Sequence, residues 1–151
     1  MFAAATRIAA VVAEKSEAEE RALEDYGRNL GIAFQLVDDA IDYDSDESEM
    51  GNGKGDDFRE GKMTLPVILA YARGTPAERA FWKDAIMGHG NADDDLARAV
   101  DLIREHDAIS ATRDRARHFA QRAIAAIAGF PPSEARSAMV EAAEFAVARR
   151  F

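Results

Sequence analysis

The chain of 151 residues is missing several features that mark common classes of protein. It has no cysteine, which excludes disulfide bonds and thiolate metal sites and fits a cytoplasmic protein. No apolar run approaches the roughly 20 residues of a transmembrane helix, and residues 1–7 lack the order of a signal peptide. Basic residues are too few for a nucleic-acid partner, because 19 Lys and Arg stand against 28 Asp and Glu. We therefore expect a cytoplasmic protein with no nucleic acid bound and no membrane-spanning segment.

The residues that are present favour an all-α fold. Apolar residues make up 48% of the chain and charged residues 31%, as in globular proteins. Their periodicity predicts a helical bundle that forms a single domain over residues 1–151. Two helices open with capping-box pairs, Ser16 with Glu19 and Thr75 with Glu78. The predicted helices are residues 2–14, 17–44, 64–74, 75–87, 93–106, 108–128 and 133–150.

The second predicted helix carries three aspartates in an otherwise apolar stretch. On an α-helix Asp38, Asp39 and Asp42 fall on one side, together with Gln35. Two like charges about 4 Å apart repel by roughly 4 kcal/mol at an effective dielectric near 20, so the cluster needs protons, cations or full solvation. The surrounding residues are too apolar for a solvated helix. Hard oxygen ligands on one rigid face suit Mg²⁺, which is often shared with the phosphates of a substrate. The pattern predicts a magnesium–diphosphate site.

A long polar loop, predicted over residues 45–63, follows these carboxylates. It is rich in glycine and contains two lysines, Lys54 and Lys62. Loops longer than about 12 to 15 residues are usually functional or disordered. Because this loop leaves the carboxylate end of the helix and carries cations, we interpret it as functional.

Two segments of this region have a familiar order of residues. Residues 34–42 read Phe-Gln-Leu-Val-Asp-Asp-Ala-Ile-Asp, and residues 55–66 read Gly-Asp-Asp-Phe-Arg-Glu-Gly-Lys-Met-Thr-Leu-Pro. They resemble the second aspartate-rich motif, and the segment after it, of the trans-isoprenyl diphosphate synthases, or polyprenyl synthetases. Bacterial octaprenyl and decaprenyl diphosphate synthases look closest. The likeness is strong over residues 1–73 and implies the C-terminal half of an isoprenoid-synthase-type fold.

The resemblance also implies an activity. Enzymes of this family are prenyltransferases that join isopentenyl diphosphate head to tail to an allylic diphosphate, usually as homodimers. It implies that Mg²⁺ on Asp38 and Asp39, with Asp42 nearby, would bind the allylic diphosphate and neutralise the leaving pyrophosphate. The expected partners are these two substrates, together with a second copy of the chain or the N-terminal half of the enzyme.

The resemblance implies catalytic or substrate-binding roles for four further residues. Lys54 and Lys62 would add positive charge at the diphosphate. Phe34 and Gln35 would face the reacting centre, where an aromatic ring can stabilise an allylic cation. We therefore expect Phe34, Gln35 and Lys62 to be catalytic, and Gln35, Lys54 and Lys62 to bind the diphosphate.

Two departures from the family pattern leave alternatives open. Asn52 stands where the family usually has lysine, so Lys54 is the candidate to replace it. The first aspartate-rich motif, a Lys-Thr pair and the basic residues for isopentenyl diphosphate are absent from these 151 residues. One hypothesis is a catalytic C-terminal half that is inactive without its N-terminal half. The other is a non-catalytic, small-subunit-like module that binds a full-length synthase.

Overall fold

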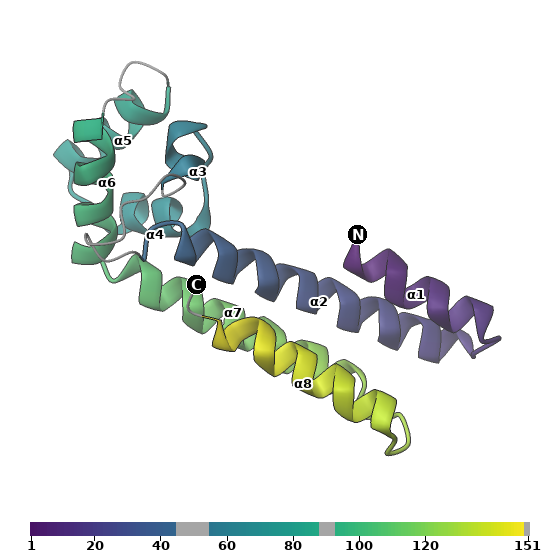
Figure 1. Cartoon of the computed structure of the whole chain (residues 1–151). Coiled ribbons are helices and arrows are strands. Elements are labelled where there is room, and N and C mark those ends of the chain that lie inside the picture. Colours follow the sequence, from purple (N-terminus) through teal and green to yellow (C-terminus); the bar gives the residue numbers. More distant parts are fainter. Residues whose placement is uncertain (45–54, 88–92, 150–151) are drawn as a thin grey trace. The chain divides into compact units, whose positions relative to one another are not determined.

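The structure, a computed structural model, describes residues 1–44, 55–87 and 93–149 (Figure 1). These residues form helices and no strand, which confirms the all-α prediction. None of the described helices is long and apolar enough to cross a membrane. The helices are α1 (Phe2–Val12), α2 (Glu17–Ile41), α3 (Asp56–Arg59), α4 (Leu65–Arg73), α5 (Pro76–Ile86), α6 (Asp93–Glu105), α7 (Ala108–Ala126) and α8 (Glu134–Ala148).

The described residues divide into two compact units, and the chain passes from one to the other within α2 and again near the start of α7. Unit 1 contains Met1–Val37 and the described residues from Asp114 on. Unit 2 contains the described residues of Asp38–Arg113. Helical periodicity reports which face of a helix is buried but not which helices share a core. The division is therefore visible only in the structure.

In unit 1, α1 packs closely on α2 because α2 has a glycine where the two helices meet. A Cβ atom on Gly27 would lie 2.3 Å from Thr6 Oγ1 and 2.6 Å from the carbonyl oxygen of Phe2. The close approach lets the Thr6 hydroxyl donate a hydrogen bond of 2.6 Å to the Leu23 carbonyl. Glycine at this position thus determines how near the two helix axes can come.

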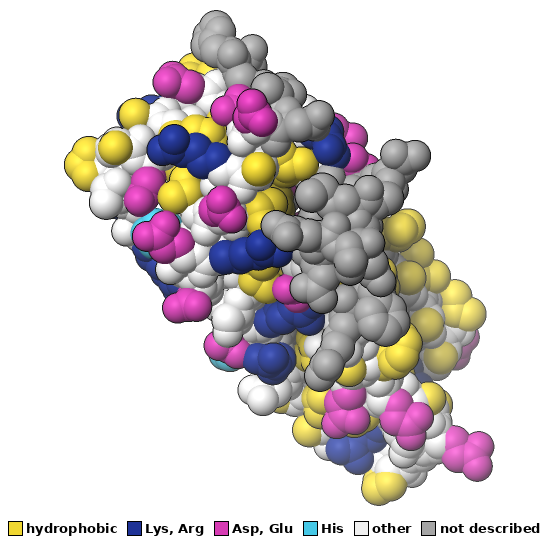
Figure 2. Space-filling view, turned by 60° about the vertical axis from the view of Figure 1, so that its left-hand side comes forward, with side chains coloured by type: hydrophobic (Ala, Val, Ile, Leu, Met, Phe, Trp, Pro, Cys, Tyr) yellow, Lys and Arg dark blue, Asp and Glu magenta, His cyan; other side chains and the backbone are white. Residues whose placement is uncertain are grey.

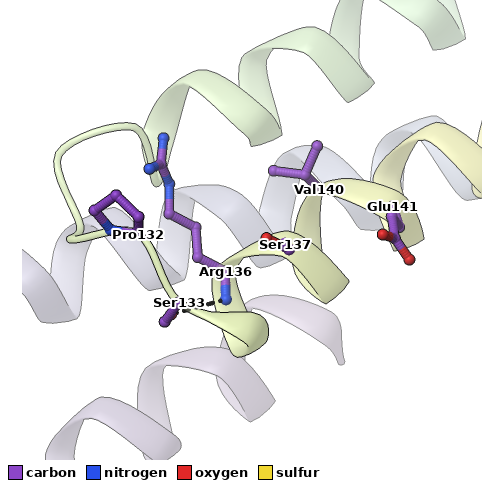
Figure 3. A pocket seen from close by; sticks show the side chains of 6 residues that line it. All are labelled: Pro132, Ser133, Arg136, Ser137, Val140 and Glu141. Carbon is purple, nitrogen blue, oxygen red and sulfur yellow. Dashed lines mark hydrogen bonds between the residues drawn. The ribbon is translucent and has the colours of Figure 1, made fainter.

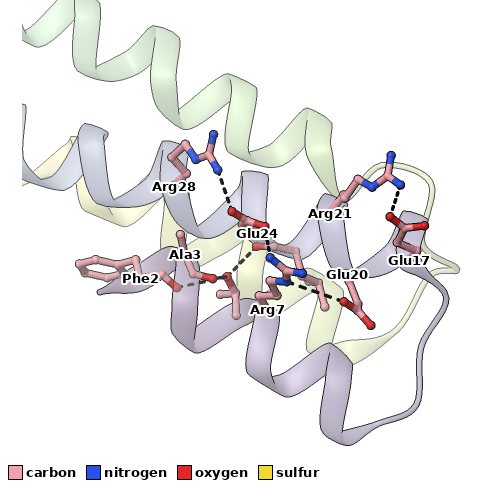
Figure 4. Close-up of polar contacts among 10 residues, drawn as sticks. Phe2, Ala3, Arg7, Glu17, Glu20, Arg21, Glu24 and Arg28 are labelled. Atoms are coloured by element: carbon pink, nitrogen blue, oxygen red, sulfur yellow. Dashed lines mark hydrogen bonds and ion pairs between the residues drawn. The ribbon is translucent and has the colours of Figure 1, made fainter.

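Ion pairs and a buried tyrosine add to unit 1. Arg7 of α1 lies 3.7 Å from Glu20 and 3.2 Å from Glu24 of α2 (Figure 4). The buried Tyr26 of α2 donates a hydrogen bond of 2.7 Å to the Met139 carbonyl of α8. Exposed ion pairs contribute only about 0–1 kcal/mol each. The apolar core therefore contributes more, and its buried members are Tyr26, Ala123, Ile127 and Ala143.

Unit 2 is built around two aromatic side chains that solvent barely reaches. The rings of Phe58 from α3 and Trp82 from α5 meet edge to face, with centroids 6.3 Å apart. This contact fastens the short helix α3 to the rest of the unit. The other buried members of its core are Tyr43, Val67, Ala70, Ala85, Ala99, Leu102, Ile103 and Ala108.

The capping boxes read from the sequence are both present. The Ser16 N–H donates to a Glu19 carboxylate oxygen at 2.9 Å, and the Glu19 N–H donates to the Ser16 hydroxyl at 3.3 Å. Thr75 and Glu78 make the same reciprocal pair, at 2.7 and 3.4 Å. Each box involves residues only three apart, so the sequence pattern was sufficient to predict it.

The end of the aspartate helix differs from the prediction. α2 ends at Ile41 and not at Asp44, because the N–H groups of Tyr43 and Asp44 bond to carbonyls three residues back. This tighter turn carries Tyr43 into the core of unit 2. The predicted loop over residues 45–63 also differs, since α3 forms within its described part.

Candidate metal and diphosphate site

The three predicted metal ligands lie at the C-terminal end of α2 and differ in exposure. Asp38 is exposed, Asp42 is half-buried and Asp39 is buried. Within residues 1–44, 55–87 and 93–149, no three acidic or histidine side chains are grouped so that they could hold a metal ion by themselves. A cation at this end of α2 would therefore take other ligands as well. Mg²⁺ usually does so, because it keeps several waters and binds substrate phosphates.

Asp42 lies in an environment that disfavours its negative charge. Burial raises the pKa of its carboxyl group, and the nearby charge of Asp57 raises it further. The backbone N–H groups of Asp57, at 3.3 Å, and of Asp56 oppose this shift. A partly buried carboxylate beside a second one is the kind of group that a bound cation stabilises.

The segment that begins at Gly55 bonds to the same end of α2. The Gly55 N–H donates a hydrogen bond of 3.2 Å to the Asp42 carbonyl. Gly55 has a φ of +73°, and a Cβ atom there would lie 2.5 Å from Leu96 Cδ1. Glycine is required on both counts, by the left-handed backbone and by the contact with α6. The segment is therefore attached to Asp42 through both the backbone and the side chain of that residue.

Lys62 is linked to this end of α2 through Asp57. Its ammonium group donates to the Asp57 carboxylate at 2.8 Å and lies 2.6 Å from the Glu60 carboxylate. Its backbone N–H also bonds to the Asp57 carbonyl, at 2.8 Å, after a turn in which Gly61 has a φ of +70°. The carboxylate of Asp57, and then that of Glu60, raise the pKa of Lys62. The structure thus brings Asp42, Asp57 and Lys62 into one connected chain of contacts.

Asp57 and Tyr43 belong to this region but were not singled out in the sequence. Asp57 lies inside the motif of residues 55–66, which was the available signal for it. Tyr43 follows Asp42 directly, and its hydroxyl is buried in the core of unit 2. Burial raises its pKa, while the Thr64 side chain acts in the opposite direction. Among the described residues neither hydroxyl meets the distance and angle criteria for a hydrogen bond.

The remaining predicted site residues belong to unit 1 or lie outside the described residues. Phe34 belongs to unit 1, where its ring centroid lies 5.8 Å from that of Phe2 and 4.1 Å from the guanidinium carbon of Arg149. Gln35, also in unit 1, is exposed. Lys54 lies outside the described residues.

Two surface hollows of the described residues contain none of the predicted site residues. One, of about 300 Å³, lies at the start of α8 between Pro132 and Glu141 (Figure 3). The other, of about 330 Å³, lies in unit 2 beside the ion pair of Arg113 with Asp44. On the face seen in Figure 2, acidic and basic side chains are interspersed. The carboxylate end of α2 is identified here by its charges and contacts.

Comparison with known proteins identifies the family of the chain. The polyprenyl synthetase family matches residues 1–103. The octaprenyl diphosphate synthase of Haemophilus influenzae is 38% identical over 151 residues, which are 100% of this chain and 46% of that protein. The octaprenyl diphosphate synthase of Escherichia coli is 38% identical over 149 residues, or 99% of this chain and 46% of the other.

Solved structures give the same result. The polyprenyl synthase of Caulobacter crescentus, in complex with calcium and isoprenyl diphosphate, is 49% identical with a TM-score of 0.88, over 99% of this chain and 46% of the other. The decaprenyl diphosphate synthase of Rhodobacter capsulatus is 41% identical with a TM-score of 0.91, over 99% and 46%. The chain spans about half the length of these relatives and matches their C-terminal half. It belongs to the polyprenyl synthetase family, as residues 34–42 and 55–66 predicted.

Proposed function

We propose that the chain is the C-terminal half of a polyprenyl diphosphate synthase, the half that carries the second aspartate-rich motif. Such an enzyme joins isopentenyl diphosphate head to tail to an allylic diphosphate with the help of Mg²⁺. The observation that supports this most strongly is the chain of contacts from Asp42 through Asp57 to Lys62. These contacts join the acidic end of α2 to the ammonium group of Lys62. A diphosphate bound through a metal ion needs carboxylates to hold the metal and positive side chains to bind the phosphates. The relatives, octaprenyl and decaprenyl diphosphate synthases, are consistent with this chemistry.

The carboxylates at the end of α2 fit Mg²⁺ by their chemistry. They offer hard oxygen ligands, and the raised pKa of Asp42 reflects a charge that lacks full solvation. We assign Asp38, Asp39 and Asp42 as the residues that would hold the ion. When bound, Mg²⁺ would stabilise the negative charge that develops on the departing pyrophosphate.

The cations of the loop would bind the diphosphate directly. The Lys62 ammonium group, whose pKa is raised by neighbouring carboxylates, is charged at physiological pH. It can then donate charge-assisted hydrogen bonds to phosphate oxygens. In this proposal Lys54 supplies a second ammonium group, and the exposed Gln35 donates from its side-chain amide.

Phe34 would act on the organic part of the substrate. Its ring already has a cation over one face, the guanidinium group of Arg149 at 4.1 Å. The negative face of an aromatic ring attracts cations of any kind. We therefore keep Phe34 as the residue that would stabilise an allylic cation as the pyrophosphate leaves.

Reconstitution tests the proposed activity. The chain is co-expressed with the upstream half of the Caulobacter crescentus relative, and Mg²⁺-dependent transfer of labelled isopentenyl diphosphate to an allylic diphosphate is measured. We expect transfer that chelation of Mg²⁺ abolishes and that Asp38→Asn reduces by about 100-fold or more. Asp94→Asn, an exposed aspartate on α6, is the matched control and should leave the rate unchanged. A complex that forms but transfers no prenyl group would overturn the proposal.

A further inference from the structure

Lys62 has two carboxylate partners that differ in their surroundings. The Asp57 carboxylate lies 2.8 Å from the ammonium nitrogen, and only 19% of that side chain is exposed. The Glu60 carboxylate lies 2.6 Å away on a side chain that is 61% exposed. The Lys62 side chain itself is 55% exposed. The two carboxylates therefore lie at similar distances from the ammonium nitrogen but differ in exposure.

Asp57 is fixed by contacts other than the one with Lys62. Its backbone N–H donates to the Asp42 carboxylate at 3.3 Å, and its carbonyl accepts from the Lys62 N–H at 2.8 Å. The next residue, Phe58, is 1% exposed and packs on Trp82. The Asp57 carboxylate is thus held in place relative to the end of α2. Glu60 lies just beyond the end of α3 with an exposed side chain.

We propose that Asp57 is a positioning residue for Lys62, and that Glu60 is a competing partner which an incoming diphosphate displaces. The proposal rests on the proposed function, because it assigns the two acids opposite effects at the same diphosphate site. Asp57, whose backbone bonds to Asp42, holds the ammonium group in one position before any ligand binds. Glu60 occupies a donor direction of the same group that faces solvent.

The physical reason is the flexibility of the lysine side chain. Its ammonium group sits on a four-carbon stem, and ordering such a side chain on binding has an entropic cost. A partner that is already fixed removes part of that cost from the binding step. An exposed ion pair is weak and screened by salt, so breaking the pair of Lys62 with Glu60 costs little free energy. A more highly charged diphosphate can therefore replace Glu60.

Two isosteric substitutions separate this proposal from simple charge neutralisation. If both acids only neutralised Lys62, Asp57→Asn and Glu60→Gln would both strengthen anion binding. If Asp57 positions Lys62, Asp57→Asn weakens binding while Glu60→Gln strengthens it. Each variant removes one negative charge beside the same ammonium group, so the comparison controls for neutralisation of Lys62.

The test is a calorimetric titration of the 151-residue chain with inorganic pyrophosphate in the presence of Mg²⁺. We expect Asp57→Asn to weaken binding by about fivefold and Glu60→Gln to tighten it by roughly twofold. A double-mutant cycle then asks whether Asp57 acts through Lys62. Asp57→Asn should have no further effect in a Lys62→Ala background. Tighter binding by both single variants, or a full effect of Asp57→Asn without Lys62, would overturn the proposal.

A second measurement needs no ligand. The ¹⁵N relaxation of the Lys62 ammonium group should show lower order in Asp57→Asn and unchanged order in Glu60→Gln, with thermal melting to verify that both variants are folded. Unchanged order in Asp57→Asn would overturn the positioning role. If the wild-type chain binds no pyrophosphate with Mg²⁺, the chain does not form a diphosphate site without the upstream half. The relaxation result then still decides whether Asp57 orders Lys62.

Discussion

The backbone N–H of Asp57 donates a hydrogen bond of 3.3 Å to the carboxylate of Asp42, 15 residues earlier in the chain. This contact brings the second acidic segment of the motif next to the first. It also places the charge of Asp57 near that of Asp42, where it raises the pKa of the Asp42 carboxyl group. At the end of α2 the charge of Asp57 therefore disfavours the ionised form of Asp42.

Asp42→Asn should stabilise the metal-free chain at neutral pH. Because burial and then Asp57 raise the folded-state pKa of Asp42, its favourable contribution is present below its ordinary pKa of 3.8 and is lost as pH rises through the folded-state value. At pH 7 the ionised carboxylate therefore destabilises the folded chain, and asparagine removes this effect. The asparagine side-chain oxygen still accepts the hydrogen bond from the Asp57 N–H. Thermal melting without Mg²⁺ should show a higher Tm at pH 7 and no gain at pH 3. A lower Tm at pH 7, with Asp94→Asn unchanged, would contradict this.

Gly55→Ala should destabilise unit 2 by about 1–3 kcal/mol. The new Cβ would lie 2.5 Å from Leu96 Cδ1, on a residue whose φ is +73°. Urea unfolding measures the loss. Gly129→Ala is the control, because a Cβ atom there meets nothing within 4 Å among the described residues, and it should change stability by less than about 0.5 kcal/mol. Equal effects of the two substitutions would show that the Leu96 contact and the left-handed backbone do not matter.

Gly27→Ala should detach α1 from α2. The new methyl group would meet the Thr6 hydroxyl at 2.3 Å and the backbone carbonyl of Phe2 at 2.6 Å, and backbone cannot move aside by a rotamer change. Overpacking of this kind typically destabilises by about 1–3 kcal/mol, partly offset by the roughly 1 kcal/mol by which alanine favours a helix over glycine. Hydrogen exchange of the α1 amides should accelerate. Exchange as slow as in the wild type would contradict the close packing.

Glu78→Gln should lower stability at neutral pH and flatten its pH dependence. The Thr75 backbone N–H, and then the His106 side chain at 3.0 Å, hold the pKa of Glu78 below its ordinary value of 4.5. A depressed carboxyl pKa contributes stability above the ordinary value, and this is lost as pH falls through the folded-state value. Urea unfolding between pH 7 and pH 3 should therefore show a smaller decline in the variant. Glu144→Gln, an exposed glutamate in α8, should keep the wild-type slope.

Much of the fold and part of the site could be predicted from the sequence. The capping boxes at Ser16 and Thr75, and the long helix that carries Asp38, depend on residues three or four apart, which the sequence places next to one another. The family could likewise be recognised from residues 34–42 and 55–66, because motifs are short and ordered along the chain. These features are local, so patterns of neighbouring residues are enough to predict them.

The other features depend on contacts between residues that are far apart in the chain. The end of α2 at Ile41, the helix α3 and the link from Asp42 through Asp57 to Lys62 depend on a segment that folds back over 15 residues and is anchored by the burial of Phe58. The division of the described residues into two units depends on which helices share a core. The physical reason is the same in each case. Contacts between distant residues form only when the free energy gained by burying side chains exceeds the entropic cost of closing the intervening chain. The periodicity of the sequence does not report this difference.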